Sequence, residues 1–171
     1  ELDVKTKTWL RHYFEEQIYP VVTPLAVDSG HPFPFFANHT INTIVRIFQV
    51  QSDGTKDYKI AILPIPSVLD RIIEVPTPSN KTHHFVYLED VINFYAIQFF
   101  QGYGIEESMT FRLTRDADLE IAEEDTKDLL TEVEASLRRR RRGDAVRLEV
   151  VGKGSPELLS TVLKSVELEK K

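Results

Sequence analysis

Five consecutive arginines are the most chemically distinctive feature of the sequence. They occupy positions 138–142, and Gly143 follows them. Guanidinium groups bind phosphate and carboxylate oxygens through two hydrogen bonds at a time, so this run suits an oxyanion. At about 100° per residue, however, five successive positions turn more than once around a helix, so the arginines cannot all face one ligand. We favour a structural interpretation, with solvated, acid-paired or helix-capping arginines, and keep an anion site and a partner interface as alternatives.

A polar corner earlier in the chain contains a second group of charged residues. Arg115, Asp116 and Asp118 follow directly after a predicted strand. Active sites of α/β proteins often lie at strand ends, and paired carboxylates can hold magnesium or share a proton transfer. Side chains that bond their own backbone, together with an Arg–Asp pair that fixes the turn, explain the same composition. We favour this structural corner over a catalytic one.

The histidines and glycines match no known catalytic pattern. No histidine stands at a metal-binding spacing from a second ligand, and nothing near any of them indicates a nucleophile activated for phosphoryl transfer. Gly102-Tyr103-Gly104 is read as a turn, and the sequence lacks a Gly-rich phosphate loop and a nucleophile elbow. From the residues we therefore assign no catalytic, cofactor-binding or metal-binding residue. The five histidines are His12, His31, His39, His83 and His84.

A strand followed by a helix must position both charged groups. Apolar residues alternate from Met109 to Leu113, which predicts a strand with one buried face. The period then changes to that of a helix, with acids in its first turn and the arginines in its last, as the helix dipole favours. Gly143 is read as the stop of this helix. The apolar stripe of the predicted helix comprises Leu129, Leu130, Val133 and Leu137.

The remaining elements are predicted to pack against this unit. Residues 20–36 hold four prolines among apolar residues, which indicates an ordered loop pinned by buried aromatics, with an exposed partner-binding loop as the alternative. The best hairpin joins 41–50 to 58–63 through Ser52-Asp53-Gly54. The order of elements predicts an α+β fold, a single domain with one mixed β-sheet covered by helices. Further helices are expected at 4–18, 88–99 and from Ser155-Pro156, and further strands at 71–75, 85–87 and 145–151.

Composition limits the classes of function. The chain has 171 residues, 42% of them hydrophobic, and a formal net charge of −6, so no general positive field would attract nucleic acid or an anionic membrane. It has no cysteine, which excludes disulfides, thiolate metal sites and cysteine nucleophiles. No apolar run approaches the roughly 20 residues that cross a bilayer. We expect a soluble intracellular protein and, because the chain opens at Glu1, an excised domain.

Four stretches together resemble the middle or "head" domain of polyphosphate kinase, the bacterial type that synthesises long-chain polyphosphate. The likeness covers almost the whole chain, in the right order. It is carried by 13–28 with 31–35, by 87–92, by 111–120, and by 138–143 followed by 145–149.

The resemblance implies a piece of a kinase that moves the terminal phosphate of ATP reversibly onto polyphosphate, through a phosphohistidine and with magnesium. In that family the phosphohistidine and most ATP contacts lie in two C-terminal domains, and a small N-terminal domain contributes as well. We expect these three domains to lie outside this sequence, and residues 1–171 to correspond to the middle domain, with 1–19 as its leading helix. We therefore carry over no catalytic residue, and expect ATP and magnesium to bind the full-length enzyme but not this chain.

The resemblance also implies partners and a location. The head domain is associated with the homodimer, in which it meets the partner subunit, and with the architecture of the active-site tunnel. Polyphosphate and ATP are reached through the absent domains, the location is cytoplasmic, and peripheral membrane association of the full-length enzyme stays open. The alternative is an anion-binding module, in which Arg138, Arg139, Arg141 and Arg142 contact polyphosphate directly. A third hypothesis, an adaptor unrelated to kinases, rests on the aromatic loop alone.

Overall fold

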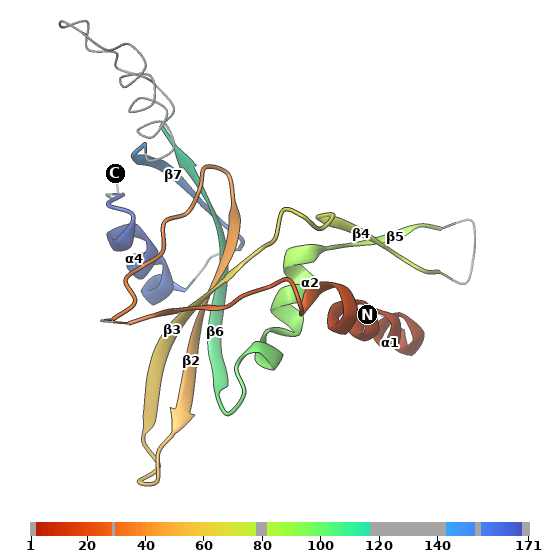
Figure 1. The fold of residues 1–171 in the computed structure, drawn as a ribbon, viewed down its shortest axis with the longest axis horizontal. Coiled ribbons are helices and arrows are strands. Elements are labelled where there is room, and N and C mark those ends of the chain that lie inside the picture. Colours follow the sequence, from red (N-terminus) through yellow and green to blue (C-terminus); the bar gives the residue numbers. More distant parts are fainter. Residues whose placement is uncertain (1–2, 29, 78–81, 117–142, 153–154, 169–171) are drawn as a thin grey trace, which may run out of the picture.

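A five-stranded antiparallel sheet forms the centre of the molecule. A computed structural model describes residues 3–28, 30–77, 82–116, 143–152 and 155–168. The strands are arranged in the order β1-β3-β2-β6-β7, and each pair of neighbouring strands is antiparallel (Figure 1). Their bounds are β1 (Leu25–Val27), β2 (Ile41–Val50), β3 (Lys56–Pro64), β6 (Gly104–Arg115) and β7 (Ala145–Val150).

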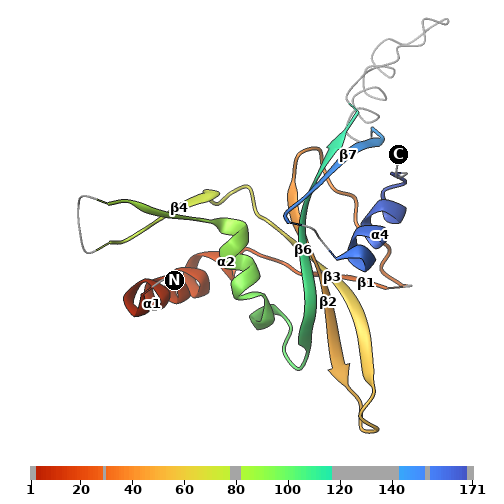
Figure 2. The ribbon, with the colours of Figure 1, turned by 180° about the vertical axis from the view of Figure 1, so that it is seen from behind.

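Helices lie on both faces of this sheet. On one face are α1 (Val4–Tyr13), its π-helical continuation η1 (Phe14–Ile18), α2 (Leu88–Phe94) and the 3-10 turn η2 (Ala96–Phe99). On the other face lies α4 (Pro156–Ser165). Figures 1 and 2, seen from opposite sides, both place α4 across the sheet from α2. None of the helices in the described ranges is long and apolar enough to span a bilayer.

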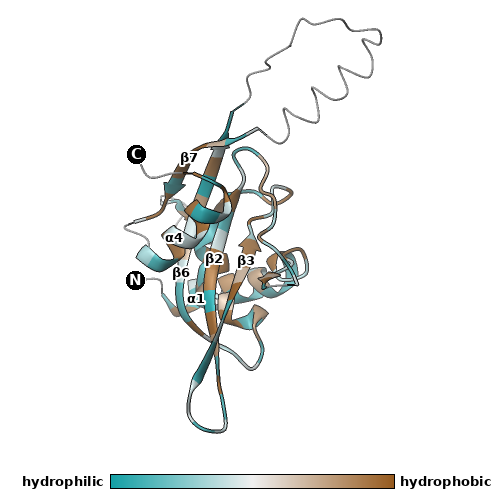
Figure 3. Ribbon diagram, turned by 90° about the vertical axis from the view of Figure 1, so that its left-hand side faces the viewer, coloured by the Kyte–Doolittle hydropathy of each residue, from teal (hydrophilic) through white to brown (hydrophobic). Residues whose placement is uncertain are grey.

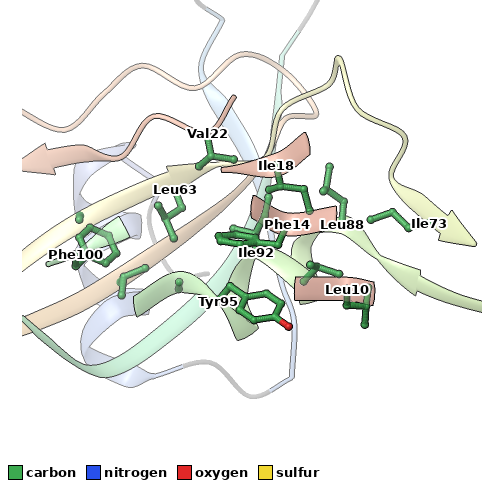
Figure 4. Packing of buried hydrophobic residues seen from close by; sticks show 14 of the residues in the cluster. Leu10, Phe14, Ile18, Val22, Leu63, Ile73, Leu88, Ile92, Tyr95 and Phe100 are labelled. Carbon is green, nitrogen blue, oxygen red and sulfur yellow. The ribbon is translucent and has the colours of Figure 1, made fainter. Parts of the chain in front are cut away.

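Alternation along the strands divides the apolar residues between two cores. Ile44 and Ile62 point toward α4, whereas their neighbours Val45 and Leu63 point toward η1 and α2. Figure 3 shows both hydrophobic and hydrophilic stretches along the strands of this sheet. In the core on the η1 and α2 side of the sheet, Phe14 stacks on Tyr95 with ring centroids 4.7 Å apart. Both side chains are labelled in Figure 4. Each side of the sheet is therefore held by its own helices.

The ends of the elements are formed by residues that the sequence identifies. Ser155 caps α4 by accepting a hydrogen bond from the backbone N–H of Leu158 at 3.3 Å, and Pro156 takes the first helical position. In the hairpin turn between β2 and β3, Gly54 has φ +84° and Asp53 accepts from the backbone N–H of Thr55 at 2.9 Å. The predicted hairpin and the predicted cap of the last helix are confirmed.

The prediction of an α+β single domain is confirmed, and the structure corrects its detail. The structure has two sheets, where one mixed sheet was expected. The second is a two-stranded antiparallel sheet formed by β4 (Ile72–Val75) and β5 (His84–Tyr87). This ribbon projects from the molecule beyond α2 (Figures 1 and 2). Pro64 is the last residue of β3 and Pro66 follows two positions later; neither has a backbone N–H to donate, so the chain leaves the large sheet after Ile65.

The proline-rich stretch 20–36 is an ordered loop, as expected. It contains β1, which pairs with β3 at the edge of the sheet. Phe36 is 4% exposed and meets Phe111 edge to face, with ring centroids 5.2 Å apart. Phe33 packs against the same core, whereas Phe35 is 54% exposed. Two of the three aromatics therefore anchor the loop, and the third lies on the surface.

Candidate functional site

Arg115, the last residue of β6, joins three segments that are distant in sequence. Its backbone N–H donates to Asn38 Oδ1 at 2.9 Å, and its Nε donates to the carbonyl of Phe36 at 2.8 Å. Its Nη1 donates to the carbonyl of Gly143 at 2.9 Å. The guanidinium thus binds main-chain oxygens on both sides of the strand end. Within the described residues, Arg115 therefore links the loop at 36–38 to the residues before β7.

The surroundings of Arg115 agree with this use. Its guanidinium carbon lies 4.3 Å from the centroid of the Phe35 ring, close enough for a cation–π contact. Burial lowers the pKa of Arg115, and the nearby charge of Asp144 acts in the opposite direction. The backbone N–H of Asp116 donates to the carbonyl of Asp144 at 2.8 Å, which extends the β6–β7 pairing by one step. Two members of the predicted corner are therefore part of a hydrogen-bonded strand end.

Gly143 is required here by close approach of two backbones. A Cβ at this position would collide with the carbonyl oxygen of Asp116. The sequence suggested a helix stop at Gly143, and the structure supplies this different steric reason for a residue without a side chain. Asp118 and the predicted helix with Arg138, Arg139, Arg141 and Arg142 lie outside the described residues. The predicted polyphosphate contact therefore stays a prediction.

A cationic group on the β6–β7 pair is present within the described part of the chain. Arg112 Nε and Nη2 both lie 2.9 Å from Glu149 Oε2, and Arg147 Nη2 lies 3.1 Å from Glu149 Oε1. The three side chains share one face of the sheet, because Arg112 is paired with Glu149 across the ladder. Two guanidinium groups thus converge on one carboxylate. The sequence predicted a strand at 145–151 and did not foresee its contact with Arg112.

Three histidines pair with carboxylates, two of them within one helix or turn and the third across the β4–β5 ribbon. His12 Nε2 lies 3.2 Å from Glu16, His31 Nδ1 lies 3.1 Å from Asp28, and His83 Nδ1 lies 2.6 Å from Glu74. These side chains are at least half exposed. Across the described ranges, no three histidine or acidic side chains gather closely enough to hold a metal ion.

Hydrogen bonds within the Asp28–His31 turn favour the charged form of the Asp28 carboxylate. Hydrogen bonds from the side chain and backbone of His31, and from the backbone N–H of Gly30, lower the pKa of Asp28. Since all these donors lie within the same turn, the carboxylate stabilises the turn itself.

His39 donates its backbone N–H to the carbonyl of Leu113 and adopts φ +63°.

An ion pair between Arg71, the residue before β4, and the buried Glu89 of α2 was not predicted. Glu89 is 5% exposed, and its Oε1 lies 2.6 Å from Nη2 and 2.9 Å from Nε of Arg71. The backbone N–H of Leu88 also donates to the carbonyl of Arg71 at 2.8 Å. The helical period offered one signal, because it places Glu89 beside Ala96 at the edge of the apolar stripe. Its partner could not be inferred, since the pair depends on tertiary structure.

Comparisons with known proteins all indicate the same family. Residues 5–171 match the family model described as "Polyphosphate kinase middle domain". A protein named Polyphosphate kinase from Halalkalibacterium halodurans is 40% identical over 171 residues, which is 99% of this chain and 24% of that protein. The Polyphosphate kinase of Pseudomonas syringae pv. tomato is 39% identical over 165 residues, 96% of this chain and 22% of the relative.

A solved structure shows the same fold. The crystal structure of polyphosphate kinase from Porphyromonas gingivalis superposes with a TM-score of 0.73 at 23% identity, over 99% of this chain and 23% of that one. The chain thus spans less than a quarter of the length of the relatives it matches. Because the family model covers nearly all of the sequence, the chain belongs to the polyphosphate kinase family, in which it corresponds to the middle domain.

Proposed function

We propose that this chain is the non-catalytic middle domain of an ATP:polyphosphate phosphotransferase. In this proposal the complete enzyme moves the terminal phosphate of ATP reversibly onto polyphosphate through a phosphohistidine, with magnesium. The N-terminal domain and the two catalytic C-terminal domains of that enzyme lie outside the present chain. Family membership and the names of the relatives support the assignment to a kinase.

The use of the described histidines is the observation that carries the non-catalytic part. A histidine that accepts a phosphoryl group needs cationic groups or backbone donors directed at the transferred oxygens. Instead, His12, His31 and His83 each have a carboxylate at 3.2 Å or less. A carboxylate that contacts one ring nitrogen supplies no cationic group or backbone donor for the transferred oxygens. These three positions therefore suit surface turns and helix faces better than phosphoryl transfer.

The proposed role of the domain is to form the homodimer and to shape the active-site tunnel. Two features support a rigid, architectural role for the domain. Both faces of the five-stranded sheet carry a packed core, and the β4–β5 ribbon is tied to α2 by the Arg71–Glu89 pair. A projecting ribbon that is fixed at its base is suited to meet another subunit (Figure 1).

A second candidate function is direct binding of polyphosphate. Arg112 and Arg147 share one carboxylate on the β6–β7 face, so this group carries a surplus of one positive charge. The arginine run at 138–142 shortly precedes β7 in sequence. An anion module would use both sets of arginines.

Calorimetric titration separates the two candidates. The chain is titrated with polyphosphate at two salt concentrations, and with ATP and magnesium in parallel. The first candidate predicts no heat of binding in either series. Binding of polyphosphate that weakens steeply with salt, without binding of ATP, would favour the anion module, because contacts with polyanions release counterions. Replacing Arg138, Arg139, Arg141 and Arg142 by Gln should then abolish that heat. ATP binding by the unaltered chain would contradict the non-catalytic assignment.

A further inference from the structure

The turn between β2 and β3 contains the one Asp-Gly sequence of the chain, Asp53-Gly54. The turn lies at an end of the large sheet, and all residues from 51 to 55 are exposed (Figure 1). No atom lies within 4 Å of the place that a Cβ of Gly54 would occupy. A side chain on the residue after an aspartate hinders attack by the backbone nitrogen of that residue on the aspartyl carboxyl. At Gly54 this hindrance is absent, and the backbone is freer than elsewhere.

An aspartate in this position can rearrange without a second protein. The backbone nitrogen of Gly54 attacks Cγ of the protonated Asp53 carboxyl. An N–Cγ bond forms and a Cγ–O bond breaks, and the amide proton and the hydroxyl leave as water, which gives a cyclic succinimide. Water then opens the ring: addition at Cγ restores aspartate, whereas addition at the main-chain carbonyl carbon leaves the chain linked through the side chain, as isoaspartate. Water is lost and then regained, so the mass stays the same.

The folded turn restrains both reacting groups. Asp53 Oδ1 accepts hydrogen bonds from the hydroxyl of Thr55 at 2.6 Å and from its backbone N–H at 2.9 Å. These bonds, the hydroxyl first, lower the pKa of Asp53 and so deplete the protonated carboxyl that reacts. The backbone N–H of Gly54 donates to the carbonyl of Gln51 at 3.0 Å. Ring closure therefore has to break hydrogen bonds at the carboxyl and at the attacking nitrogen.

We propose that Asp53-Gly54 is a site of spontaneous isoaspartate formation and that the hydroxyl of Thr55 slows this reaction in the folded domain. The product has an additional backbone atom in the turn, whereas β2 and β3 are paired as far as Val50 and Lys56 on either side of it. A longer turn no longer matches this register, because turn length fixes the pairing of a hairpin. The modification thus loosens this end of the sheet. The inference is independent of the proposed function.

The test is incubation of the chain at neutral pH, followed by tryptic peptide mapping over time. Peptide 47–56 contains Asp53 and no asparagine, so isoaspartate in it arises from Asp53 alone. The isoaspartyl form has the same mass, separates by chromatography and is identified by electron-transfer fragmentation. Thr55→Val removes the hydroxyl and keeps a β-branched side chain, whereas Thr55→Ser is the matched control that keeps the hydroxyl. Asp57 is the internal control, because its side chain is 48% exposed in the same hairpin but Tyr58 follows it.

The expected result is gradual accumulation of isoaspartate at Asp53 and none at Asp57. Thr55→Val should raise the rate about threefold or more, the factor that corresponds to loss of one ordinary hydrogen bond, and Thr55→Ser should stay near the original rate. The original chain unfolded in guanidinium chloride should react faster than the folded chain, because every restraint is then lost. Circular dichroism identifies a variant that fails to fold, in which case the comparison of the folded and unfolded original chain decides.

Three contrary results would overturn different parts of the inference. Absence of isoaspartate from peptide 47–56 in every variant would show that Asp53-Gly54 is not a modification site. Equal rates in the original chain and in folded Thr55→Val would remove the role of the Thr55 hydroxyl. A folded chain that reacts as fast as the unfolded chain would show that the turn provides no restraint at all.

Discussion

Arg71 Nη2 lies 2.6 Å from Glu89 Oε1, and this contact joins an exposed side chain to a buried one. The Glu89 side chain is 6% exposed, whereas that of Arg71 is 54% exposed. The two partners are therefore not equivalent. A buried carboxylate without its cation is strongly unfavourable, while an exposed guanidinium without its anion is simply hydrated.

Replacing Arg71 by Met should destabilise the domain, because Met keeps the apolar stem and removes the charge. We expect a loss of about 1–3 kcal/mol in the free energy of unfolding, below the value for fully buried pairs because solvent screens the arginine. Urea unfolding at neutral pH measures this change. The double variant Arg71→Met/Glu89→Leu is the control and should recover most of the loss. A single variant as stable as the original would show that the pair contributes nothing.

Asp90 should respond to pH in the direction opposite to a paired carboxylate. Partial desolvation of this otherwise exposed side chain, followed by the neighbouring charge of Glu89, raises the pKa of Asp90 above its ordinary value of 3.8, and Arg71 acts in the opposite direction. Its ionisation therefore opposes folding: the penalty is absent below the pKa of the unfolded chain and fully present above the raised pKa of the folded chain.

Asp90→Asn should therefore stabilise the domain at neutral pH. The gain should disappear below about pH 3.8, where the Asp90 side chain of the original chain is protonated and as neutral as the amide of the variant. Paired urea unfolding curves at pH 7 and pH 3 test this. A variant that is less stable than the original at pH 7 would mean that the helix dipole at the first turn of α2 outweighs burial.

Gly143→Ala should cost more stability than Gly104→Ala. At Gly143 the new methyl group meets the carbonyl oxygen of Asp116, which belongs to the backbone of a paired strand end. At Gly104 it meets the outer atoms of the Phe48 ring, a side chain that can rotate away. We expect about 2–3 kcal/mol for Gly143→Ala and about 1 kcal/mol for Gly104→Ala, as for overpacked sites. Thermal unfolding ranks the two, and the reverse order would contradict the described approach of residues 116 and 143.

Local signals predicted a large part of the fold. The alternation from Ile41 to Val50, the turn at Asp53-Gly54 and the Ser155-Pro156 cap each act within a few residues, so they are visible in sequence. The ribbon β4–β5 was recognised only as two short strands. Its strands have four residues each, and apolar side chains on both faces leave no period that would reveal which sheet they join.

The candidate site was less predictable for a related reason. Arg115 was singled out at a strand end, but its partners Phe36 and Gly143 reach it only through the tertiary fold. The corner was expected to hold itself through local side-chain contacts, whereas the guanidinium binds main-chain carbonyls of distant segments. Glu89 likewise meets Arg71 only because β4 packs beside α2. Sequence patterns identify which residues are unusual, and long-range pairing decides what they contact.

The most direct test of the central claim is transfer of radiolabelled terminal phosphate from ATP to the isolated chain in the presence of magnesium and polyphosphate. A non-catalytic middle domain predicts no acid-labile label on the protein and no lengthening of polyphosphate beyond a heat-denatured control. Label on any histidine of this chain, or measurable turnover, would contradict the account, because the chain would then carry its own phosphoryl-accepting site.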